Sequence, residues 1–316
     1  MRTSLFKFAL AMPLSEASFP RRGFRCNDAA VRTHLEFIGG SFLRGYNLAI
    51  EDRNGDALTN GLEQIEHEFR GFAYEGAAMA LALLDRLTPW KHTRLQLFID
   101  GPASSHIYMA YVGAGWSLAR VPIRRRSPLV NPHPLLRWLE FDGYGFHEGF
   151  FHWPKYIRDV TPPAKLKGYA ARVFDQGLGR SMWFVEGADV ERITATIETF
   201  PHARRSDLWS GVGLACAYAG GANRAGVEEL RRLACGYNKE LAQGVAFAAK
   251  TRLLAGNLTT NTETVCNVLC GLSAAGAASI TDATLADLSK TESVPAYEIW
   301  RQRIQNQFFT ESKNYA

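Results

Sequence analysis

The 316-residue sequence lacks a long hydrophobic run. Its apolar stretches fall well short of the roughly 18 residues that a membrane-spanning helix needs. The apolar stretch that follows Met1 is short and is interrupted by Lys7, which argues against a secretory signal peptide. We therefore expect no membrane span and a cytoplasmic protein.

Cysteine is scarce, with five residues in the chain. An odd number cannot pair completely, and four of the five lie among apolar or small residues, which favours reduced thiols in a cytoplasm. Cys266 and Cys270 have helical spacing, but no second pair of cysteines or histidines lies nearby. A zinc site is therefore not expected.

Strong charge of either sign is also missing. The net charge is +5, and the densest basic run, Arg124–Arg126, lies between prolines in a connector. A nucleic-acid surface would interleave basic residues with aromatic ones along one face. We therefore predict a solvated loop at this run and no nucleic-acid partner.

Motifs of several enzyme classes are absent. The sequence has no P-loop, no GxSxG elbow, no DDxxD or DxDD cluster of terpene cyclases, and no dinucleotide fingerprint after a strand. His147 and His152 are five residues apart, about 140° around a helix. Zinc metalloproteases need histidines four apart on one face. We predict no cofactor and no metal.

A series of glycines inside Ala-rich, helix-like segments is the main feature that is present. Their spacing of 30 to 37 residues leaves room for two helices and two turns, the size of a helical hairpin. Around Gly76, apolar residues recur on one helical face. The series comprises Gly45, Gly76, Gly113, Gly149, Gly179, Gly213, Gly244 and Gly276.

Glycine inside a helix costs about 1 kcal/mol relative to alanine. The usual reason is that the missing side chain lets another helix approach or leaves room for a ligand. We predict an all-α fold of degenerate helical-hairpin repeats of about 30–37 residues, forming a curved α-solenoid or partial α/α toroid with an aromatic-lined cavity. Residues 1–35 should form an irregular N-terminal arm, and residues 36–316 a single all-α repeat domain. The segment Leu95–Asp100 could be a short strand or the start of a buried helix.

Half of the residues that precede the repeat glycines are large and polar. These are Arg44, Glu75, Glu148 and Gln243. Equivalent positions in stacked repeats line up in space, so the four would line one groove if the row faces the concave side. If the row faces outward, they would be solvated or would pair with one another. Tyr74 and His147 beside them make a poor helix surface and keep the first interpretation open.

The densest titratable cluster outside the charged connectors lies in one short segment. It comprises Asp142, Tyr144, His147, Glu148 and His152. Glu148 and His152 share a helix face and could transfer a proton, bind a metal together, or simply hydrogen-bond. We predict Glu148 as the main proton donor or acceptor, oriented by His147 or His152. Apolar neighbours such as Phe146 and Phe150 should raise its pKa by desolvation.

Further candidates extend this site. His106 lies seven residues before Gly113 on the same face, where a core histidine is the ordinary interpretation. Arg180 could clamp a carboxylate or phosphate, or pair with Glu75 or Glu148. The predicted catalytic residues are Glu148, Glu75, His147, His152 and His106, with Glu75 and Glu148 reaching one cavity. The predicted substrate-binding residues are Arg44, Tyr74, Trp116, Asp142, Tyr144, Gln176, Arg180, Trp183, Trp209 and Gln243.

Six segments, taken in order, resemble a known family. They are residues 36–47, 71–79, 111–119, 142–149, 175–183 and 208–215, and the fourth contains the string GYGFHEG. Together they are similar to the uncharacterised domain-of-unknown-function family 1702 of enediyne polyketide biosynthesis gene clusters. The resemblance implies a bacterial cytoplasm, specialised metabolism and a neighbouring synthase that makes linear conjugated polyenes. It implies no particular reaction.

The resemblance implies a protein of enediyne-type polyketide biosynthesis. It would bind a hydrophobic polyene or polyketide-derived intermediate and isomerise or cyclise it by general acid/base chemistry. The alternative is a non-catalytic scaffold or binding protein for other pathway enzymes or for a reactive intermediate. Buried carboxylates with raised pKa values in a closed pocket would favour the enzyme, and exposed polar residues in an open groove would favour the scaffold.

Overall fold

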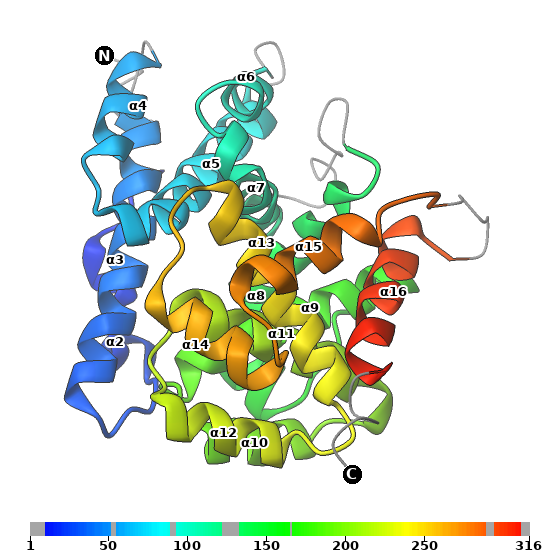
Figure 1. Cartoon of the computed structure of the whole chain (residues 1–316). Coiled ribbons are helices and arrows are strands. Elements are labelled where there is room, and N and C mark those ends of the chain that lie inside the picture. Colours follow the sequence, from blue (N-terminus) through cyan, green and yellow to red (C-terminus); the bar gives the residue numbers. More distant parts are fainter. Residues whose placement is uncertain are drawn as a thin grey trace.

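The computed structural model describes residues 10–51, 55–88, 93–121, 133–164, 166–288 and 294–310. All regular structure in these ranges is helical, with no strand among them, as Figure 1 shows. The predicted all-α class is confirmed. The ambiguous segment Leu95–Asp100 falls in a helix, and the basic run Arg124–Arg126 lies outside the described ranges.

The chain contains both long and short helices. The long helices are α3 (Ala29–Glu51), α5 (Arg70–Leu87), α7 (Ile107–Arg120), α8 (Leu139–Phe151), α9 (Tyr169–Val185), α11 (His202–Ala219), α13 (Asn238–Leu254) and α16 (Ala296–Thr310). The shorter ones are α2 (Phe19–Arg22), α4 (Asp56–Glu63), α6 (Arg94–Asp100), α10 (Val190–Glu198), α12 (Arg224–Leu233), α14 (Thr260–Leu269) and α15 (Ala274–Ala283). Single turns lie at Leu14–Ala17, His67–Phe69, Ser104–His106, Leu136–Trp138 and Pro154–Arg158.

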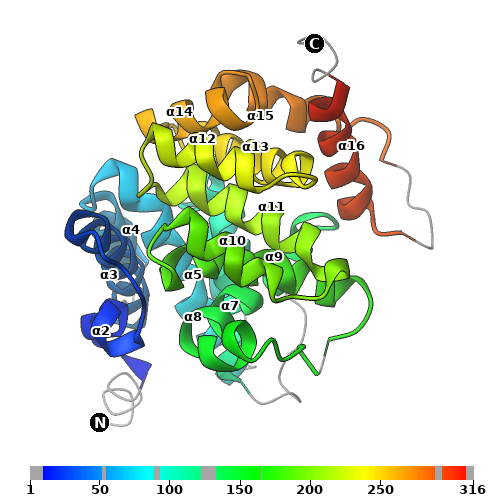
Figure 2. The ribbon, with the colours of Figure 1, turned by 90° about the horizontal axis from the view of Figure 1, so that it is seen from below.

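The long helices pack in chain order. Each of α3, α5, α7, α8, α9, α11 and α13 has its most extensive contacts with the next or the previous member, and α15 follows α13. Helices α10, α12 and α14 pack against one another beside this row. In Figures 1 and 2, α3 and α4 stand at one side of the molecule and α16 stands at the opposite side. The interior between them holds the apolar core.

Glycines make the contacts between consecutive helices. A Cβ added to Gly45 of α3 would lie 1.9 Å from the carbonyl oxygen of Ala73 in α5. One added to Gly76 of α5 would lie 1.9 Å from the carbonyl oxygen of Phe42 in α3. The contact is therefore reciprocal, and residue numbers rise on one helix as they fall on the other, so the helices run in opposite directions. Any side chain at either glycine would push them apart.

Helices in the middle of the row carry two such glycines, two residues apart. On α8, Gly143 faces the Val112 carbonyl of α7, and Gly145 faces the Phe174 carbonyl of α9. Residues two apart point about 200° apart around a helix, so the pair presents one bare face to each neighbour. The same arrangement recurs in Gly113 and Gly115 of α7, Gly177 and Gly179 of α9, and Gly211 and Gly213 of α11.

All eight glycines of the predicted series lie in helices, and all but the half-buried Gly276 are buried. The prediction that they mark helix–helix contacts is confirmed for most of the series. The series nevertheless mixes two kinds of position, because Gly76 and Gly244 face the preceding helix whereas Gly179 faces the following one. Gly149 contacts Ser181 and lies outside the paired positions. The predicted series therefore equates glycines that occupy different positions on successive helices.

All five cysteines are free thiols, as expected. Among the described helices, none is by itself long and apolar enough to cross a membrane. Helices α14 and α15, which are joined at a bend, are long and apolar enough when they are taken together.

Candidate functional site

The glycine contacts define a set of equivalent residues, which we call the inner row. The carbonyls that face Gly76, Gly113, Gly143, Gly177, Gly211 and Gly244 belong in turn to Phe42, Glu75, Val112, Asp142, Gln176 and Ser210. These six residues therefore occupy matching places on successive helices. Their side chains line two internal cavities, Phe42 and Glu75 the first and the other four the second.

The polar row predicted from the sequence agrees with the inner row in part. Glu75 belongs to it, and Gln243, which precedes Gly244, continues it on α13 and is fully buried. Arg44 instead lies exposed on α3, with its guanidinium 5.6 Å from the centre of the Phe37 ring. Glu148 follows the inner-row residue Asp142 by six positions. The structure does not bring the four together, because the predicted register equated glycines of different kinds.

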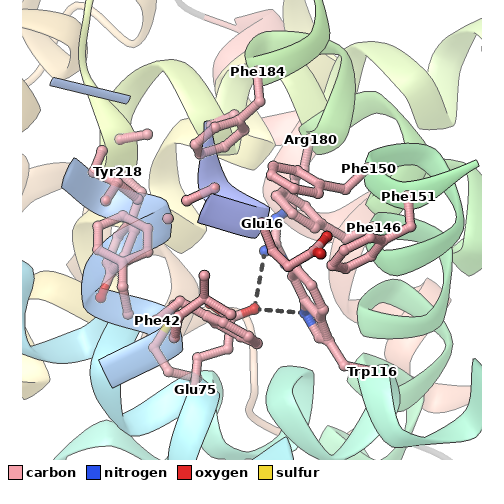
Figure 3. A pocket seen from close by; sticks show the side chains of 18 of the residues that line it. Glu16, Phe42, Glu75, Trp116, Phe146, Phe150, Phe151, Arg180, Phe184 and Tyr218 are labelled. Carbon is pink, nitrogen blue, oxygen red and sulfur yellow. Dashed lines mark hydrogen bonds and ion pairs between the residues drawn. The ribbon is translucent and has the colours of Figure 1, made fainter. Parts of the chain in front are cut away.

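The first cavity has an almost wholly apolar lining, and we call it the aromatic cavity. About 650 Å³ of atom-free space lies within its bounds, and this figure includes space open to solvent. Phe42, Phe72, Trp116, Phe146, Phe184 and Tyr218 contribute rings to it. Figure 3 shows the rings of Phe42, Trp116, Phe146, Phe184 and Tyr218 around the polar side chains of Glu16, Glu75 and Arg180.

Glu75 supplies the buried carboxylate of this cavity. The residue is 2% exposed, and its Oε1 accepts a hydrogen bond of 2.9 Å from the Trp116 indole nitrogen. An Arg180 guanidinium nitrogen lies 3.5 Å from the same oxygen (Figure 3). Burial raises the pKa of Glu75 to about 7, against the opposing pull of Arg180 and Trp116. Near neutral pH this carboxyl can therefore both hold and release a proton.

Arg180 is shared between two carboxylates. It donates a charge-assisted hydrogen bond to Asp142 and forms the ion pair with Glu75. Burial raises the pKa of Asp142 as well, with Arg180 opposing it. One guanidinium cannot neutralise two carboxylates, so full ionisation would leave a net negative charge in a nearly dry interior. Retention of one proton by the group removes that charge, in agreement with the raised pKa of Glu75.

A second polar cluster lies at the end of α8. His147 Nδ1 is 3.3 Å from one oxygen of Glu148, and His152 Nδ1 is 3.5 Å from the other. Burial pushes the pKa of Glu148 up, but the hydrogen bonds from the two histidines outweigh it and hold the pKa well below its usual range. The expectation of a raised Glu148 pKa is therefore wrong. Burial lowers the pKa of His147, so its imidazole is neutral at neutral pH.

This cluster stands apart from the aromatic cavity. Trp116 lies between the two, with its indole hydrogen-bonded to Glu75 and its ring centre 5.7 Å from that of His147. The described lining of the aromatic cavity includes Glu75 but not Glu148 or either histidine. Single ligand atoms of His147, Glu148 and His152 lie within 4.8 Å of one another. Among the residues that the structure describes, these three are the group whose ligand atoms lie close enough together to hold a divalent metal.

The remaining predicted residues serve mainly as core. His106 is buried and stacks on Tyr74 at 4.2 Å between ring centres. Burial lowers the pKa of His106 to about 4, and Tyr74 donates to Glu63 at 2.9 Å. Trp183 donates to the Gly220 carbonyl at 2.7 Å. Trp209 stacks on Tyr237, and Tyr144 packs edge-on against Phe174.

Gln176 and Gln243 join a polar network that fixes the C-terminal helix. Arg301 of α16 is 1% exposed and donates at 2.8 Å to both Asp207 and Glu298. Gln176 donates to Asp207 at 3.3 Å, and Gln243 accepts from Arg301 at 3.1 Å. A buried guanidinium needs such partners, so the network holds α16 against the inner helices.

A family model described as a protein of unknown function (DUF1702) matches residues 1–308. The chain belongs to this family. No curated protein and no solved structure matches it. The DUF1702 match covers every helix that lines the aromatic cavity.

Sequence reasoning missed several residues that line this DUF1702 cavity. Phe42, Phe72 and Phe184 are examples, and Tyr218 carries a buried hydroxyl without a hydrogen-bond partner among the described residues. Glu16 reaches the cavity from the single turn Leu14–Ala17 and pairs with Arg22 at 2.5 Å. The spacing from each paired glycine could have identified the inner-row residues. The N-terminal turn left no comparable signal.

Proposed function

We propose that the protein binds an elongated hydrophobic molecule in the aromatic cavity and moves a proton on it with Glu75. The supporting observation is the position of Glu75, a buried carboxyl that lines an aromatic cavity and is held by Trp116 and Arg180. The raised pKa agrees with this role, because general acid/base catalysis is most efficient when the pKa lies near the working pH.

The chemistry that fits is isomerisation or cyclisation of a conjugated chain. The Glu75 carboxyl donates its proton to one carbon of a polyene, and the resulting carboxylate removes a proton from another, which restores the acid and shifts the double bonds. Arg180 holds the carboxylate in place between the two transfers. The aromatic rings suit a flat conjugated ligand and its cationic intermediate. This scheme needs no redox cofactor.

The biological setting is part of the same proposal. The family resemblance implies enediyne-type polyketide biosynthesis in a bacterial cytoplasm, where linear polyenes are made. We also propose that the row of helices curves into a partial α/α toroid, with the inner row on its concave side. Such an arrangement would surround the substrate with equivalent positions of successive helices.

Solvent deuterium incorporation tests the catalytic proposal. The purified protein is incubated in D₂O with the polyene released by the neighbouring synthase, and the product is examined by mass spectrometry. Proton transfer by Glu75 predicts a rearranged product carrying solvent deuterium, and loss of both in Glu75→Gln. Glu148→Gln serves as the matched control, since it changes a buried carboxylate outside the cavity.

A non-catalytic binding protein is the second candidate, and the apolar lining favours it. A cavity of this kind would shield a reactive polyene from water whether or not a proton moves. The same experiment separates the two. Tight binding of an unchanged polyene without deuterium would retain the binding role and remove the catalytic one.

A further inference from the structure

A second cavity lies beside the aromatic cavity. It holds about 640 Å³ of atom-free space, a figure that includes space open to solvent. It is lined by Asp142, Gln176 and Ser210 of the inner row, together with Phe247 of α13 and Trp300 of α16. Its walls are mostly apolar, with more polar groups than those of the aromatic cavity. Nothing in the proposed chemistry uses this space.

The two cavities share four lining residues. Met109 of α7, Arg180 of α9, and Leu214 and Tyr218 of α11 each line both. We call these four residues the waist, because each of them borders both spaces. They come from three different helices, α7, α9 and α11.

The three charged residues at the waist, Arg180, Glu75 and Asp142, are divided between the two cavities. Arg180 belongs to both cavities, its partner Glu75 lines only the aromatic cavity, and its partner Asp142 lines only the second cavity. The inner row also passes without interruption from one cavity to the other, from Phe42 and Glu75 onward. The two spaces are therefore consecutive parts of one interior.

We propose that the two cavities form a single elongated site for one linear, mainly apolar chain, whose middle segment passes the waist beside Glu75, Arg180 and Asp142. The proposal deepens the binding function proposed above and rests on it. It specifies the substrate class as a chain longer than either cavity. It also places the proton transfer at interior atoms of the chain rather than at its end.

Chain-length dependence of binding tests the proposal without any catalysis. Octanol, dodecanol and hexadecanol are measured by displacement of the fluorescent tetraene cis-parinaric acid. One continuous site predicts that affinity rises roughly threefold to fourfold per methylene across the whole series, with one hexadecanol bound per chain. An affinity that stops rising between octanol and dodecanol, or two long chains per molecule, would overturn the proposal.

Leu214 provides the variant that blocks the waist. In Leu214→Trp, hexadecanol should lose at least about tenfold more affinity than octanol does, as expected when two or more methylenes are expelled. Leu254→Trp on the exposed side of α13 is the matched control and should change neither. Equal weakening of octanol and hexadecanol in Leu214→Trp would contradict a waist.

A crystal structure with 16-bromohexadecan-1-ol covers the case in which the variant does not fold. Anomalous scattering from bromine in one cavity, with the hydroxyl end of the same chain in the other, is the expected result. Bromine and hydroxyl in one cavity would overturn the proposal. The crystal structure reads binding directly. A continuous site would therefore be established even if the protein incorporated no deuterium, and deuterium incorporation would not by itself establish a continuous site.

Discussion

Glu75 and Glu148 are two buried glutamates with opposite acid–base behaviour. Glu75 shares its single cationic partner with Asp142, and burial raises its pKa to about 7. Glu148 is less deeply buried, at 8% exposure against 2% for Glu75, and the hydrogen bonds from two histidines outweigh its burial and lower its pKa. Both carboxylates have two donors, so the deeper burial of Glu75 and the sharing of its cation with Asp142 decide which one can act as an acid.

The largest expected effect is on catalytic turnover, which should respond differently when Glu75 and when Glu148 is replaced. Glu75→Gln keeps the shape of the side chain and removes its titrating proton, so turnover of the bound polyene should fall roughly 10²–10⁴-fold. Glu148→Gln should leave turnover within about threefold of wild type, because its charged form takes no part in proton transfer. Product formation is measured by chromatography, with circular dichroism to verify folding. A large loss in Glu148→Gln alone would reverse the assignment.

Removal of one partner from each cluster should affect stability unequally. Arg180→Met leaves Glu75 and Asp142 buried without their partner, which should lower the free energy of unfolding by about 3–5 kcal/mol at neutral pH. His152 is exposed, so His152→Ala should cost less than about 1 kcal/mol. Urea denaturation at pH 7 measures both. Similar costs for the two variants would show that Arg180 is not the essential partner.

The pH dependence of stability should differ in sign between the two glutamates. The folded state raises the pKa of Glu75 from 4.5 to about 7, so its stabilising contribution is complete below 4.5 and is lost as pH rises through 7. Relative to wild type, Glu75→Gln should therefore gain stability from pH 5 to pH 8, by about 3 kcal/mol at most. Glu148 has a lowered pKa, so its contribution is present above its ordinary pKa and is lost in acid.

Urea denaturation of both variants provides the measurement, over a range that extends from about pH 8 to well below the ordinary pKa of a glutamate. Glu148→Gln should be less stable than wild type at neutral pH, and the difference should shrink as the solution becomes acidic. Parallel curves for the two variants would contradict the opposite pKa shifts.

The smallest effect concerns the indole that donates to Glu75. Trp116→Phe removes a hydrogen bond that favours the charged carboxylate, so the pKa of Glu75 should rise by about one unit. Carbon-13 NMR of labelled glutamate carboxyls measures it. Trp183→Phe is the matched control, since its indole donates to the Gly220 carbonyl instead. A shift in the control of the same size would indicate a general change in packing.

Much of the helical framework could be predicted from the sequence. A glycine in an Ala-rich segment has one strong steric consequence, close approach of another helix, and the buried Gly45, Gly76 and Gly244 show it. The ion pair between Arg180 and Glu75 was among the predicted options and is present. Each of these features depends on residue type and spacing alone.

The candidate site could be predicted only in part. The inner row requires knowing which glycine of a pair faces which neighbour, and the sequence around Gly145 and Gly149 does not distinguish them. The low pKa of Glu148 depends on rotamers that bring His147 and His152 to its two oxygens. Glu16 reaches the cavity through tertiary contact of an N-terminal turn, which no local pattern encodes.

The contacts between successive glycine-bearing helices also bear on how the chain is assembled. Each long helix docks on the one synthesised just before it, so the row can be built from the N-terminus as translation proceeds. Asp207 of α11 is the exception, because its buried partner Arg301 belongs to α16 and follows it by 94 residues. The Asp207 carboxylate therefore stays without that partner until α16 has been synthesised. The arrival of α16 then completes the ion pairs of this buried carboxylate.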